Sequence, residues 1–373
     1  MGPRETSSTL TDLQIPSISA AQAMEGGFQV IDVRAPSEFA DGHMPGSLNF
    51  PLLDDATRAQ VGVCYEREGA ARARLVAMEL VSPHLPQYLG ELAHVSRSLP
   101  KGRRLAIMCW RGGDRSRNVA LLLALVGVHV MTVRGGYRAY RREVLDGLSQ
   151  WRPPMPVFTL FGHAGAGKSA LLRALAVLSP SLEAPRPWTV DLEELALHRG
   201  SLLGGLNQSG ERTQKDFDSL LWDELRHPQG DYLVLEGEGG KIGPIFLPGT
   251  VAEAVRSGIP VLVSAPPAAR AERIVREYAP EGWDEVDRES FLRGLKIIAP
   301  RLARERTTFL ERGFADGRFT DVVEGLLTDY YDPLYRRSSV EGRRFVLEIE
   351  TTSDAAEDAR CFAAEAARLI REA

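Results

Sequence analysis

A glycine-rich loop in the middle of the chain constrains the fold more than any other feature of the sequence. The segment Gly162-His-Ala-Gly-Ala-Gly-Lys-Ser169 matches the pattern G-x-x-x-x-G-K-[ST] in full. It follows a short apolar run, residues 157–161, and precedes a segment with helical periodicity, residues 169–178. This strand–loop–helix context makes the pattern specific. The sequence therefore predicts a parallel α/β domain with a polyphosphate site, whose ligand the motif does not identify.

The residue types of this loop suit a diphosphate. The glycines let the backbone wrap the phosphates, and N–H groups at the helix start donate to them. Lys168 would neutralise phosphate charge, and Ser169 could ligate Mg²⁺. The later apolar run 232–235 ends in Glu236, where such domains usually carry Asp, so metal binding there is a hypothesis. The predicted site comprises Gly162, Gly165, Gly167, Lys168, Ser169 and Glu236, and no resident metal is predicted.

Three prolines within four positions, at 153, 154 and 156, mark the clearest domain boundary, because proline resists both helix and sheet. We expect an N-terminal domain over residues 12–147, a linker over 148–156, and a second domain over 157–373 with a helical region at about 280–337. Both halves alternate apolar runs with helical segments, the pattern of α/β domains. Strands are expected at residues 30–33, 105–108, 130–133, 157–161, 232–235, 260–264 and 345–349, helices at 116–125 and 169–178, and a closing helix at 353–373.

The composition of the chain limits the cellular compartments in which the protein is expected to work. The longest nearly apolar stretch, residues 119–133, contains His129 and falls short of the ~20 residues that cross a bilayer. The N-terminus lacks the apolar core of a signal peptide. Three cysteines are too few and too scattered for a disulfide framework. We therefore expect a cytoplasmic protein without a membrane segment, in which any important cysteine works as a thiol.

The formal net charge of −5 conceals an asymmetry. Residues 1–150 carry a net charge of +2, so the acidity belongs to the second half. Residues 97–142 hold eleven basic residues and one acid, Asp114. Such a local field favours a polyanion, either nucleic acid or a phosphorylated substrate, although a basic span can also be an ordinary solvated face.

That basic span contains the segment Cys109-Trp-Arg-Gly-Gly-Asp-Arg-Ser116, between an apolar strand and a helix. Its amides, the helix start and two arginines would stabilise a thiolate and hold an incoming anion. The glycines and arginines have no evident packing role in the sequence, so we interpret the loop as a site rather than as a buried thiol. The catalytic candidates are Cys109, Arg111, Gly112, Gly113 and Arg115.

Segments on both sides of this loop carry a resemblance to rhodanese domains. Ile31-Asp-Val-Arg34, Glu38-Phe39 and the segment 42–51 resemble the opening signature of that family, and Arg134-Gly-Gly-Tyr137 resembles its closing segment. The resemblance implies that Cys109 is the nucleophile, which in rhodaneses carries sulfur or selenium as a persulfide-type adduct. Its five-residue spacing to Arg115 is also similar to that of cysteine phosphatases. The loop alone therefore does not separate chalcogen transfer from phosphate-ester hydrolysis.

The whole chain, from about residue 12 to 350, resembles the tRNA 2-selenouridine synthase family. The segment 62–69, the cysteine loop, the block 191–201 (DLEELALHRGS) and the block 330–335 (YYDPLY) are similar to segments of that family, in the same order. The sequence departs from the family at 236–241, which lacks an acid and a Ser-Arg pair, and at 212–215, which lacks part of a Q-P-S-Q stretch. Whether Lys241 replaces the missing arginine stays open.

The resemblance implies a reaction and its substrates. Members of the family replace the sulfur of wobble 2-thiouridine in tRNA by selenium, after alkylation of that sulfur by geranyl diphosphate and with selenophosphate as the selenium donor. We expect the P-loop to hold the diphosphate and Cys109 to serve the selenium step, either by carrying selenium or by acting on a selenophosphate-linked intermediate. A selenophosphate-supplying enzyme is a possible partner. Matches to the family's motifs add four residues to the predicted P-loop site, namely Asp191, Glu193, His198 and Arg199. Four residues within the basic span are predicted to contact RNA, namely Trp110, Arg138, Arg141 and Arg142.

Several alternatives stay open on the sequence alone. An ATP-dependent kinase with a rhodanese-like regulatory module, a cysteine phosphatase, and a non-catalytic RNA-binding or chalcogen-relay adaptor are all compatible with parts of the pattern. Asp191 and its neighbours also suit ordinary helix capping, and Trp110 suits a core position under the loop.

Overall fold

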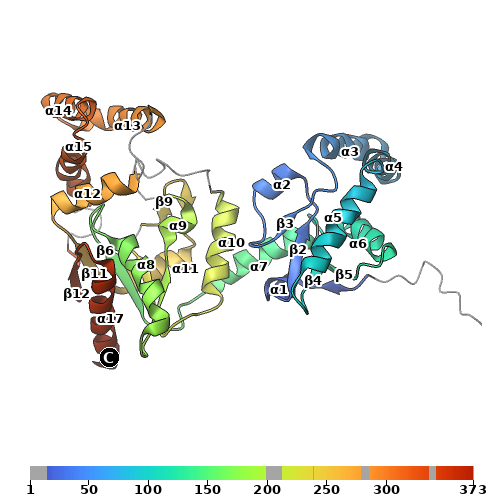
Figure 1. Ribbon diagram of the computed structural model, residues 1–373, viewed down its shortest axis with the longest axis horizontal. Helices are drawn as coiled ribbons and strands as arrows, with labels where there is room; N and C mark the ends of the chain where they lie inside the picture. The colour runs from blue at the N-terminus through green and yellow to red at the C-terminus, as the bar shows by residue number, and fades with distance from the viewer. Residues whose placement is uncertain (1–14, 199–211, 238, 279–284, 336–341, 373) are drawn as a thin grey trace, which may run out of the picture. The chain divides into compact units, whose positions relative to one another are not determined.

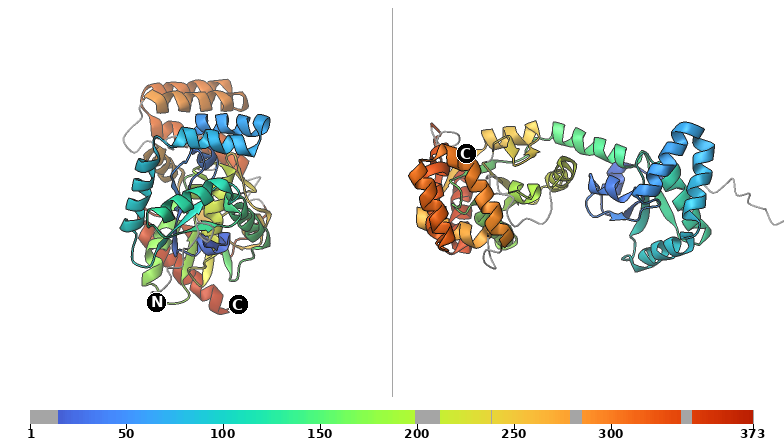
Figure 2. Two further views of the ribbon diagram at one scale, coloured as in Figure 1. Left: turned by 90° about the vertical axis from the view of Figure 1, so that its right-hand side faces the viewer. Right: turned by 90° about the horizontal axis from the view of Figure 1, so that it is seen from above.

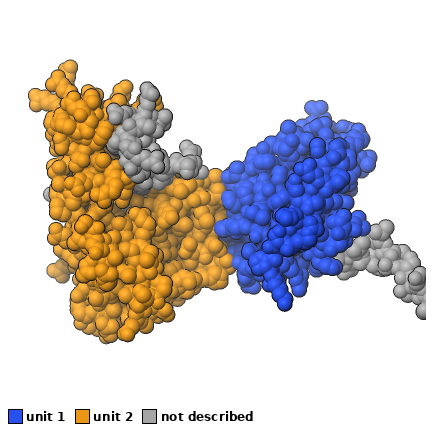
Figure 3. All heavy atoms as spheres, viewed as in Figure 1, with its two compact units in different colours: residues 1–147 blue, residues 148–373 orange. Residues whose placement is uncertain are grey.

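The computed structural model describes residues 15–198, 212–237, 239–278, 285–335 and 342–372 of the chain. It divides into two compact units, Met1–Gly147 and Leu148–Ala373, which Figure 3 distinguishes by colour. Each unit is built on its own five-stranded parallel sheet with connecting helices. The α/β fold class predicted for both halves is therefore confirmed. Among the described helices, none has the length and apolar content that crossing a membrane requires.

The sheet of the first unit has the strand order β1-β5-β4-β2-β3. Its strands are β1 (Ser17–Ile18), β2 (Phe28–Asp32), β3 (Leu48–Asn49), β4 (Arg104–Met108) and β5 (Val130–Val133). The helices are α1 (Ala20–Met24), α2 (Pro36–Ala40), α3 (Asp55–Glu68), α4 (Ala70–Val81), α5 (Leu85–Ser98), α6 (Asp114–Leu125) and α7 (Gly136–Gln150). Apolar side chains of β2, β4, α5 and α6 form one core, and the central strand β4 leads directly into the cysteine loop.

The sheet of the second unit has the order β12-β11-β6-β8-β7, with all pairs parallel. Its strands are β6 (Val157–Phe161), β7 (Pro187–Val190), β8 (Tyr232–Glu236), β11 (Ile259–Ser264) and β12 (Leu347–Glu350). A short antiparallel pair, β9 (Lys241–Ile242) and β10 (Ile245–Phe246), lies outside this sheet. From β6 the chain goes first to β7 and β8 on one side and later to β11 and β12 on the other. The crevice at the carboxyl end of β6 is therefore a topological switch point, where ligands bind in such sheets.

Helices surround this second sheet. They are α8 (Lys168–Leu178), α9 (Leu192–Ala196), α10 (Gln214–Leu225), α11 (Gly249–Ser257), α12 (Pro267–Tyr278), α13 (Glu285–Ile298), α14 (Arg304–Ala315), α15 (Phe319–Leu326), the π-helical turn η4 (Leu327–Tyr331), α16 (Asp332–Tyr335) and α17 (Ala355–Glu372). The closing helix α17 and α8 share one core with the sheet. In Figures 1 and 2, α13, α14 and α15 gather at one end of the unit, beside α12.

The expected strands and helices lie where the sequence placed them, within one or two residues at most ends. Two differences have simple causes. The strand β7 was not predicted, because two prolines, at 185 and 187, precede its short apolar stretch. The helix α7 continues to Gln150, so the first residues of the expected linker are helical and the prolines begin only after it.

Candidate functional sites

Glycines give the P-loop its shape. Gly165 and Gly167 have φ angles of +74° and +97°, in the left-handed region that side chains rarely adopt. A Cβ at Gly162 would lie 2.2 Å from the carbonyl oxygen of Val263 in β11, so only glycine fits beside that strand. Gly167 caps α8, whose N-terminal amides face the loop. Lys168 Nζ donates to the Gly162 carbonyl across the loop at 2.9 Å. The loop thus has the backbone form and the cation that a diphosphate site needs.

Two carboxylates, those of Glu236 and Glu193, lie near the hydroxyl group of Ser169, the first-turn residue of α8. Ser169 Oγ lies 2.8 Å from Oε1 of Glu236, at the end of β8, and 3.4 Å from Oε2 of Glu193. Glu236 is fully buried, and its second oxygen accepts from the Glu193 amide. Asp191 caps α9 by accepting from the Glu194 amide. Burial raises the pKa of Asp191, and nearby Glu194 raises it further. The structure thus brings Ser169, Asp191, Glu193 and Glu236 together, and Asp191 is both a helix cap and a site neighbour.

A cavity of about 340 Å³ adjoins the P-loop, and its lining has a polar part and an apolar part. The polar part consists of the loop and of charged side chains that include Arg173, Arg273, Asp191 and Glu193. The apolar part consists of Ile274 of α12, Phe291 of α13, Val323 and Leu326 of α15, and Leu327 and Tyr331 of η4. The helices α12, α13 and α15 and the turn η4 thus add a hydrophobic wall to a phosphate site, which the sequence did not indicate.

Residues far along the chain brace the P-loop. Arg270 of α12 is 3% exposed, donates its Nε to the Ala164 carbonyl at 2.9 Å, and binds Asp332 through two bonds of 2.6 and 2.8 Å. His163 Nδ1 lies 3.2 Å from the same carboxylate. The Gly162 amide donates to the Tyr335 hydroxyl at 2.8 Å. The YYDPLY block that carried part of the family resemblance therefore holds the loop in place.

Two further arginines stand near the phosphate loop. Arg273 donates to the Gly165 carbonyl and to Thr351 Oγ1, and it lines the cavity. Arg173 Nη1 lies 3.8 Å from Asp191 Oδ2. Neither was predicted as a site residue. No short motif marks Arg270, Arg173 or Arg273 in the sequence, since each belongs to an ordinary amphipathic helix, whereas Asp332 and Tyr335 lay inside a block already recognised.

We expect the substitution Asp332→Asn to loosen this brace. Partial burial alone would raise the pKa of Asp332, but hydrogen bonds from Arg270 and His163 outweigh it and hold that pKa well below its ordinary value. The ionised carboxylate therefore stabilises the fold above the ordinary pKa, and this contribution is lost as the pH falls through the lowered one. At pH 7 the free energy of unfolding should drop by roughly 2–3 kcal/mol, as when a buried pair loses one partner.

Urea unfolding of the wild type and Asp332→Asn at pH 7 and at descending pH checks this expectation. The difference between the two proteins should shrink as the medium becomes more acidic. Asp316→Asn is the matched control, because Asp316 is exposed and lies 3.4 Å from Arg318 in a surface pair worth little. Equal effects of the two substitutions at pH 7 would contradict the bracing role.

Other expected P-loop residues lie apart from the cavity or outside the described part of the chain. The His198 ring packs over Gly243, where a Cβ would lie 2.4 Å from the ring, and the His198 amide donates to the Glu193 carbonyl. His198 is not among the residues that line the cavity. Arg199 lies outside the described residues. Lys241, in β9, holds its ammonium group 5.0 Å above the exposed Phe246 ring of β10 and does not line the cavity either.

The cysteine loop of the first unit runs from the end of β4 to the start of α6. Cys109 is 3% exposed, and its Sγ lies 3.2 Å from Oγ of the fully buried Ser116. Ser116 also donates to the Gly113 carbonyl at the cap of α6. The Cys109 thiol therefore lies beside a hydroxyl group and next to the start of α6. Ser116 stood in the recognised motif but was not singled out as a site residue.

The closing segment of the first unit locks this loop by close backbone packing. The Tyr137 and Arg138 amides donate to the carbonyls of Cys109 and Trp110 at 2.8 and 3.0 Å. A Cβ at Gly136 would lie 2.1 Å from the Cys109 carbonyl oxygen, and one at Gly112 would lie 2.8 Å from the Val133 oxygen. The expectation that the loop glycines have no packing role is therefore wrong for Gly112. It holds for Gly113, where a Cβ would meet no atom within 4 Å.

The two arginines of the loop differ. Arg115 binds the Glu38 carboxylate of α2, with Nη1 2.7 Å from Oε2. Partial burial alone would raise the pKa of Glu38, but Arg115 outweighs it and the pKa is lowered. Arg115 thus also has a structural role as an ion-pair partner. Arg111 is exposed at the rim. The loop therefore carries one guanidinium group that is held in an ion pair, that of Arg115, and one that is exposed, that of Arg111.

Below the loop lies a buried ion pair from the opening signature. Arg34 is 1% exposed and binds the fully buried Asp32 through Nε and Nη2. Its guanidinium carbon lies 3.8 Å from the centre of the Tyr137 ring, and Trp110 is tilted against the same ring at 5.7 Å. Trp110 is half-buried, so it both packs under the loop and keeps part of its ring accessible.

The expected RNA contacts other than Trp110 lie on α7. Arg138 and Arg142 are exposed, and Arg141 is half-buried. Residues four apart on a helix share a face, so Arg138 and Arg142 point the same way from a helix that begins beside the cysteine loop.

Comparison with known proteins gives matches to both units. Residues 18–143 match the model of the rhodanese-like domain, and residues 155–364 match that of the tRNA 2-selenouridine synthase AAA domain. The chain is 33% identical over 337 residues to the tRNA 2-selenouridine synthases of Salmonella paratyphi A (strain ATCC 9150 / SARB42) and Salmonella agona (strain SL483), covering 82% of this chain and 88% of each relative. A crystal structure of a rhodanese-related protein from Thermoplasma volcanium is 22% identical, with a TM-score of 0.21, over 34% of this chain and 92% of that one.

Proposed function

Because the chain belongs to the tRNA 2-selenouridine synthase family, we propose that it replaces the sulfur of wobble 2-thiouridine in tRNA by selenium, through an S-geranyl intermediate. It would thus act as a transferase with geranyl diphosphate and selenophosphate as co-substrates. The P-loop unit would perform the alkylation, and the cysteine loop would serve the selenium step. A tRNA substrate implies that the enzyme works in the cytoplasm, and a selenophosphate-supplying enzyme is a natural partner.

One observation carries the first half of this proposal. The P-loop cavity combines a phosphate cradle with an apolar wall, and geranyl diphosphate combines a diphosphate with a C10 hydrocarbon chain. A pocket evolved for phosphoryl transfer from ATP has no comparable need for a wall built largely of aliphatic and phenyl side chains. The wall therefore favours a prenyl diphosphate over the kinase alternative.

In the alkylation step the thiocarbonyl sulfur bonds to C1 of the geranyl group, and the C1–O bond to diphosphate breaks with its electron pair on oxygen. The N3 proton of the base passes to solvent. Lys168 and the loop amides from Gly165 to Ser169 would stabilise the charge of the leaving diphosphate. Arg173 and Arg273, which line the same end of the cavity, would add to that positive field.

A magnesium ion fits the residues at this end. Ser169 and Glu236 offer the hydroxyl and carboxylate oxygens that Mg²⁺ prefers, alongside oxygens of the diphosphate. Within the described ranges no group of three or more His, Cys, Asp and Glu side chains is arranged to hold a metal. Bound there, the ion would neutralise charge on the leaving group.

The selenium step can be balanced without any redox partner. Selenium of selenophosphate bonds to C2 of the base, and the C2–S bond breaks as geranyl thiol departs with the selenophosphate proton. A Se–P bond then remains to be cleaved. Attack of Cys109 sulfur on phosphorus would release 2-selenouridine, with the thiol proton going to N3. Water would then hydrolyse the phosphocysteine to thiol and phosphate. Loading selenium onto Cys109 as a persulfide-type adduct would instead require an oxidant.

The contacts of Cys109 support action at phosphorus. Its five-residue spacing to Arg115, the hydroxyl of Ser116 at 3.2 Å, and the helix start at Gly113 suit a cysteine nucleophile that receives a phosphoryl group. Trp110 would stack on the unpaired anticodon base, and Arg138, Arg141 and Arg142 would contact the backbone phosphates. These assignments give each half of the chain one chemical task.

The test is nucleoside mass spectrometry of tRNA bearing 2-thiouridine after incubation with the enzyme. With geranyl diphosphate alone we expect S-geranyl-2-thiouridine, and with added selenophosphate we expect 2-selenouridine. Replacing geranyl diphosphate by ATP should leave the nucleoside unchanged. Phosphoryl transfer from ATP to a small molecule, without any response to geranyl diphosphate, would overturn the proposal in favour of a kinase.

A further inference from the structure

We propose that Phe291, backed by Phe314, ends the prenyl-binding part of the P-loop cavity and so sets the chain length of the diphosphate that the enzyme accepts. This inference rests on the proposed function and adds to it a specificity-determining residue. It concerns the apolar wall contributed by α12, α13, α15 and η4, which no sequence motif marks.

The side chains of the wall belong to two clusters, one next to the phosphate loop and one beyond it. Ala164 of the loop packs against a small apolar cluster that contains Val323 and Leu327 together with Ile274. Val323, Leu327 and Ile274 therefore form the part of the wall that is in the same cluster as the loop. A second cluster, centred on α13–α15, contains Phe291 and Leu326. Tyr331 packs against both clusters, so it joins the near part of the wall to the far part.

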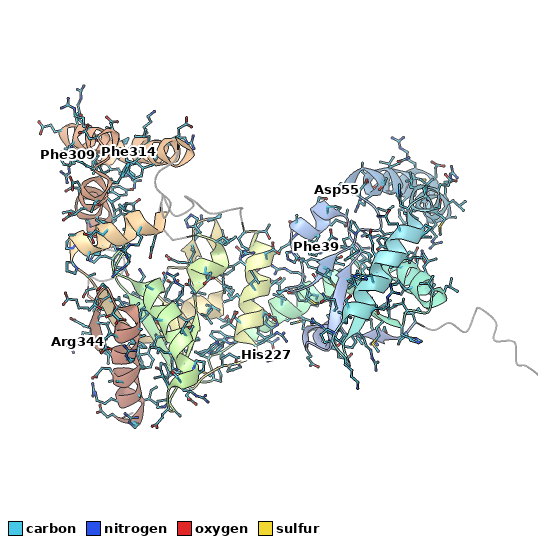
Figure 4. All side chains as sticks on the ribbon, in the orientation of Figure 1. Phe39, Asp55, His227, Phe309, Phe314 and Arg344 are labelled. Atoms are coloured by element: carbon cyan, nitrogen blue, oxygen red, sulfur yellow. The ribbon has the colours of Figure 1, made fainter. Side chains whose placement is uncertain are left out.

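Phe291 forms a rigid end to this path. Its side chain is 1% exposed, and its ring stacks on Phe314 of α14 with centroids 4.4 Å apart and planes inclined by 8°. Phe314, labelled in Figure 4, meets Phe319 edge-on at 5.1 Å. Because Phe314 is itself packed against Phe319, the Phe291 ring cannot swing aside without disrupting the core of the helical group. A hydrocarbon chain that enters from the loop would therefore stop at Phe291.

The size of the cavity agrees with a short chain. About 340 Å³ lies at the lower end of the ~300–1,000 Å³ typical of ligand pockets. A diphosphate occupies part of that volume at the polar end. The remaining apolar part suits a C10 chain, whereas one more isoprene unit would have to displace the Phe291 ring.

The experiment compares C5, C10 and C15 prenyl diphosphates as alkyl donors for 2-thiouridine tRNA, with the wild type and the variants Phe291→Leu and Phe291→Ala. Both substitutions should raise the C15 to C10 ratio of kcat/KM, with Phe291→Ala raising it on the order of 10–100-fold, as expected when a pocket wall retreats. The rate with the C5 donor should change least, because its chain ends before Phe291.

Leu295→Ala is the matched control. Leu295 lies one turn further along α13, is 2% exposed and belongs to the same cluster, but it does not line the cavity. A merely structural role of Phe291 would make both variants lose activity toward all donors together. An unchanged C15 to C10 ratio in a folded Phe291→Leu protein would overturn the inference.

A binding measurement separates this inference from the proposed reaction. Calorimetric titration with geranyl and farnesyl diphosphates needs no tRNA and no turnover. If the wild type forms no S-prenyl nucleoside, the proposed function fails. A shift of relative affinity toward the C15 ligand in Phe291→Leu would then still support the chain-length role, and equal relative affinities would refute it.

Discussion

The substitution Lys168→Ala should abolish formation of S-geranyl-2-thiouridine while leaving tRNA binding intact. Lys168 is the cation of the P-loop, and its ammonium group lies 2.9 Å from the Gly162 carbonyl at the mouth of the cradle. Charge on the departing diphosphate grows in the transition state, so loss of this group should lower the alkylation rate by about 10³-fold or more. The fold should survive, because Lys168 is half-buried at the first position of α8 and alanine is a good helix former.

The measurement is single-turnover appearance of the S-geranyl nucleoside, with tRNA binding followed in parallel. Lys241→Ala is the control, since its ammonium group rests above the exposed Phe246 ring and does not line the cavity. It should retain alkylation. If Lys241→Ala were as inactive as Lys168→Ala, Lys241 would have taken over the role of the arginine that the family has in this region.

Selenation of tRNA already geranylated by the wild type should proceed normally in Lys168→Ala, and its failure there would contradict separate tasks for the two units.

The substitution Cys109→Ala should have the complementary effect. S-geranyl-2-thiouridine should form at the wild-type rate, while 2-selenouridine falls by about 10³-fold or more, as when a covalent nucleophile is removed. Because Cys109 would act on the Se–P bond, geranyl thiol should still be released and a phosphoselenyl nucleoside should accumulate. Cys361→Ala, which removes an exposed thiol on α17, should behave as the wild type.

Mass spectrometry of the nucleosides and detection of geranyl thiol together decide the role of the thiol. Persistence of the S-geranyl nucleoside without release of geranyl thiol would mean that Cys109 delivers selenium, not that it removes the phosphoryl group. Loss of alkylation itself in a folded, tRNA-binding Cys109→Ala protein would overturn the division of labour between the two units.

The sequence predicted the parts of the fold that have local signatures. The P-loop and the cysteine loop carry patterns within eight residues each, and their flanking strands and helices follow from apolar periodicity. The carboxylate Glu236 could be placed near Ser169 because acidic strand ends occur opposite P-loops. Its hydrogen bond to Ser169 in the structure agrees with that placement.

The features that the sequence missed depend on contacts between distant residues. The apolar wall comes from α12, α13, α15 and η4, each of which has an ordinary amphipathic pattern, so nothing in the sequence says which apolar face turns toward the P-loop. The packing role of Gly112 likewise follows only from Val133, 21 positions along the chain, in the neighbouring strand β5. The Arg270–Asp332 pair joins residues 62 apart.

The distance along the chain between the P-loop and its brace also bears on how the protein is made. Every partner of the cysteine loop described above lies between residues 32 and 138, so that loop can close as soon as the first unit leaves the ribosome. In contrast, the hydrogen bond between the Gly162 amide and the Tyr335 hydroxyl can form only after another 173 residues have been synthesised. The bond from Thr351 to the Ala166 carbonyl forms later still. Such non-local contacts close slowly and late during synthesis. A nascent chain that stops before residue 332 would carry the complete glycine motif, yet its phosphate loop would lack the contacts from Tyr335 and Thr351, and Arg270 would lack its partner Asp332.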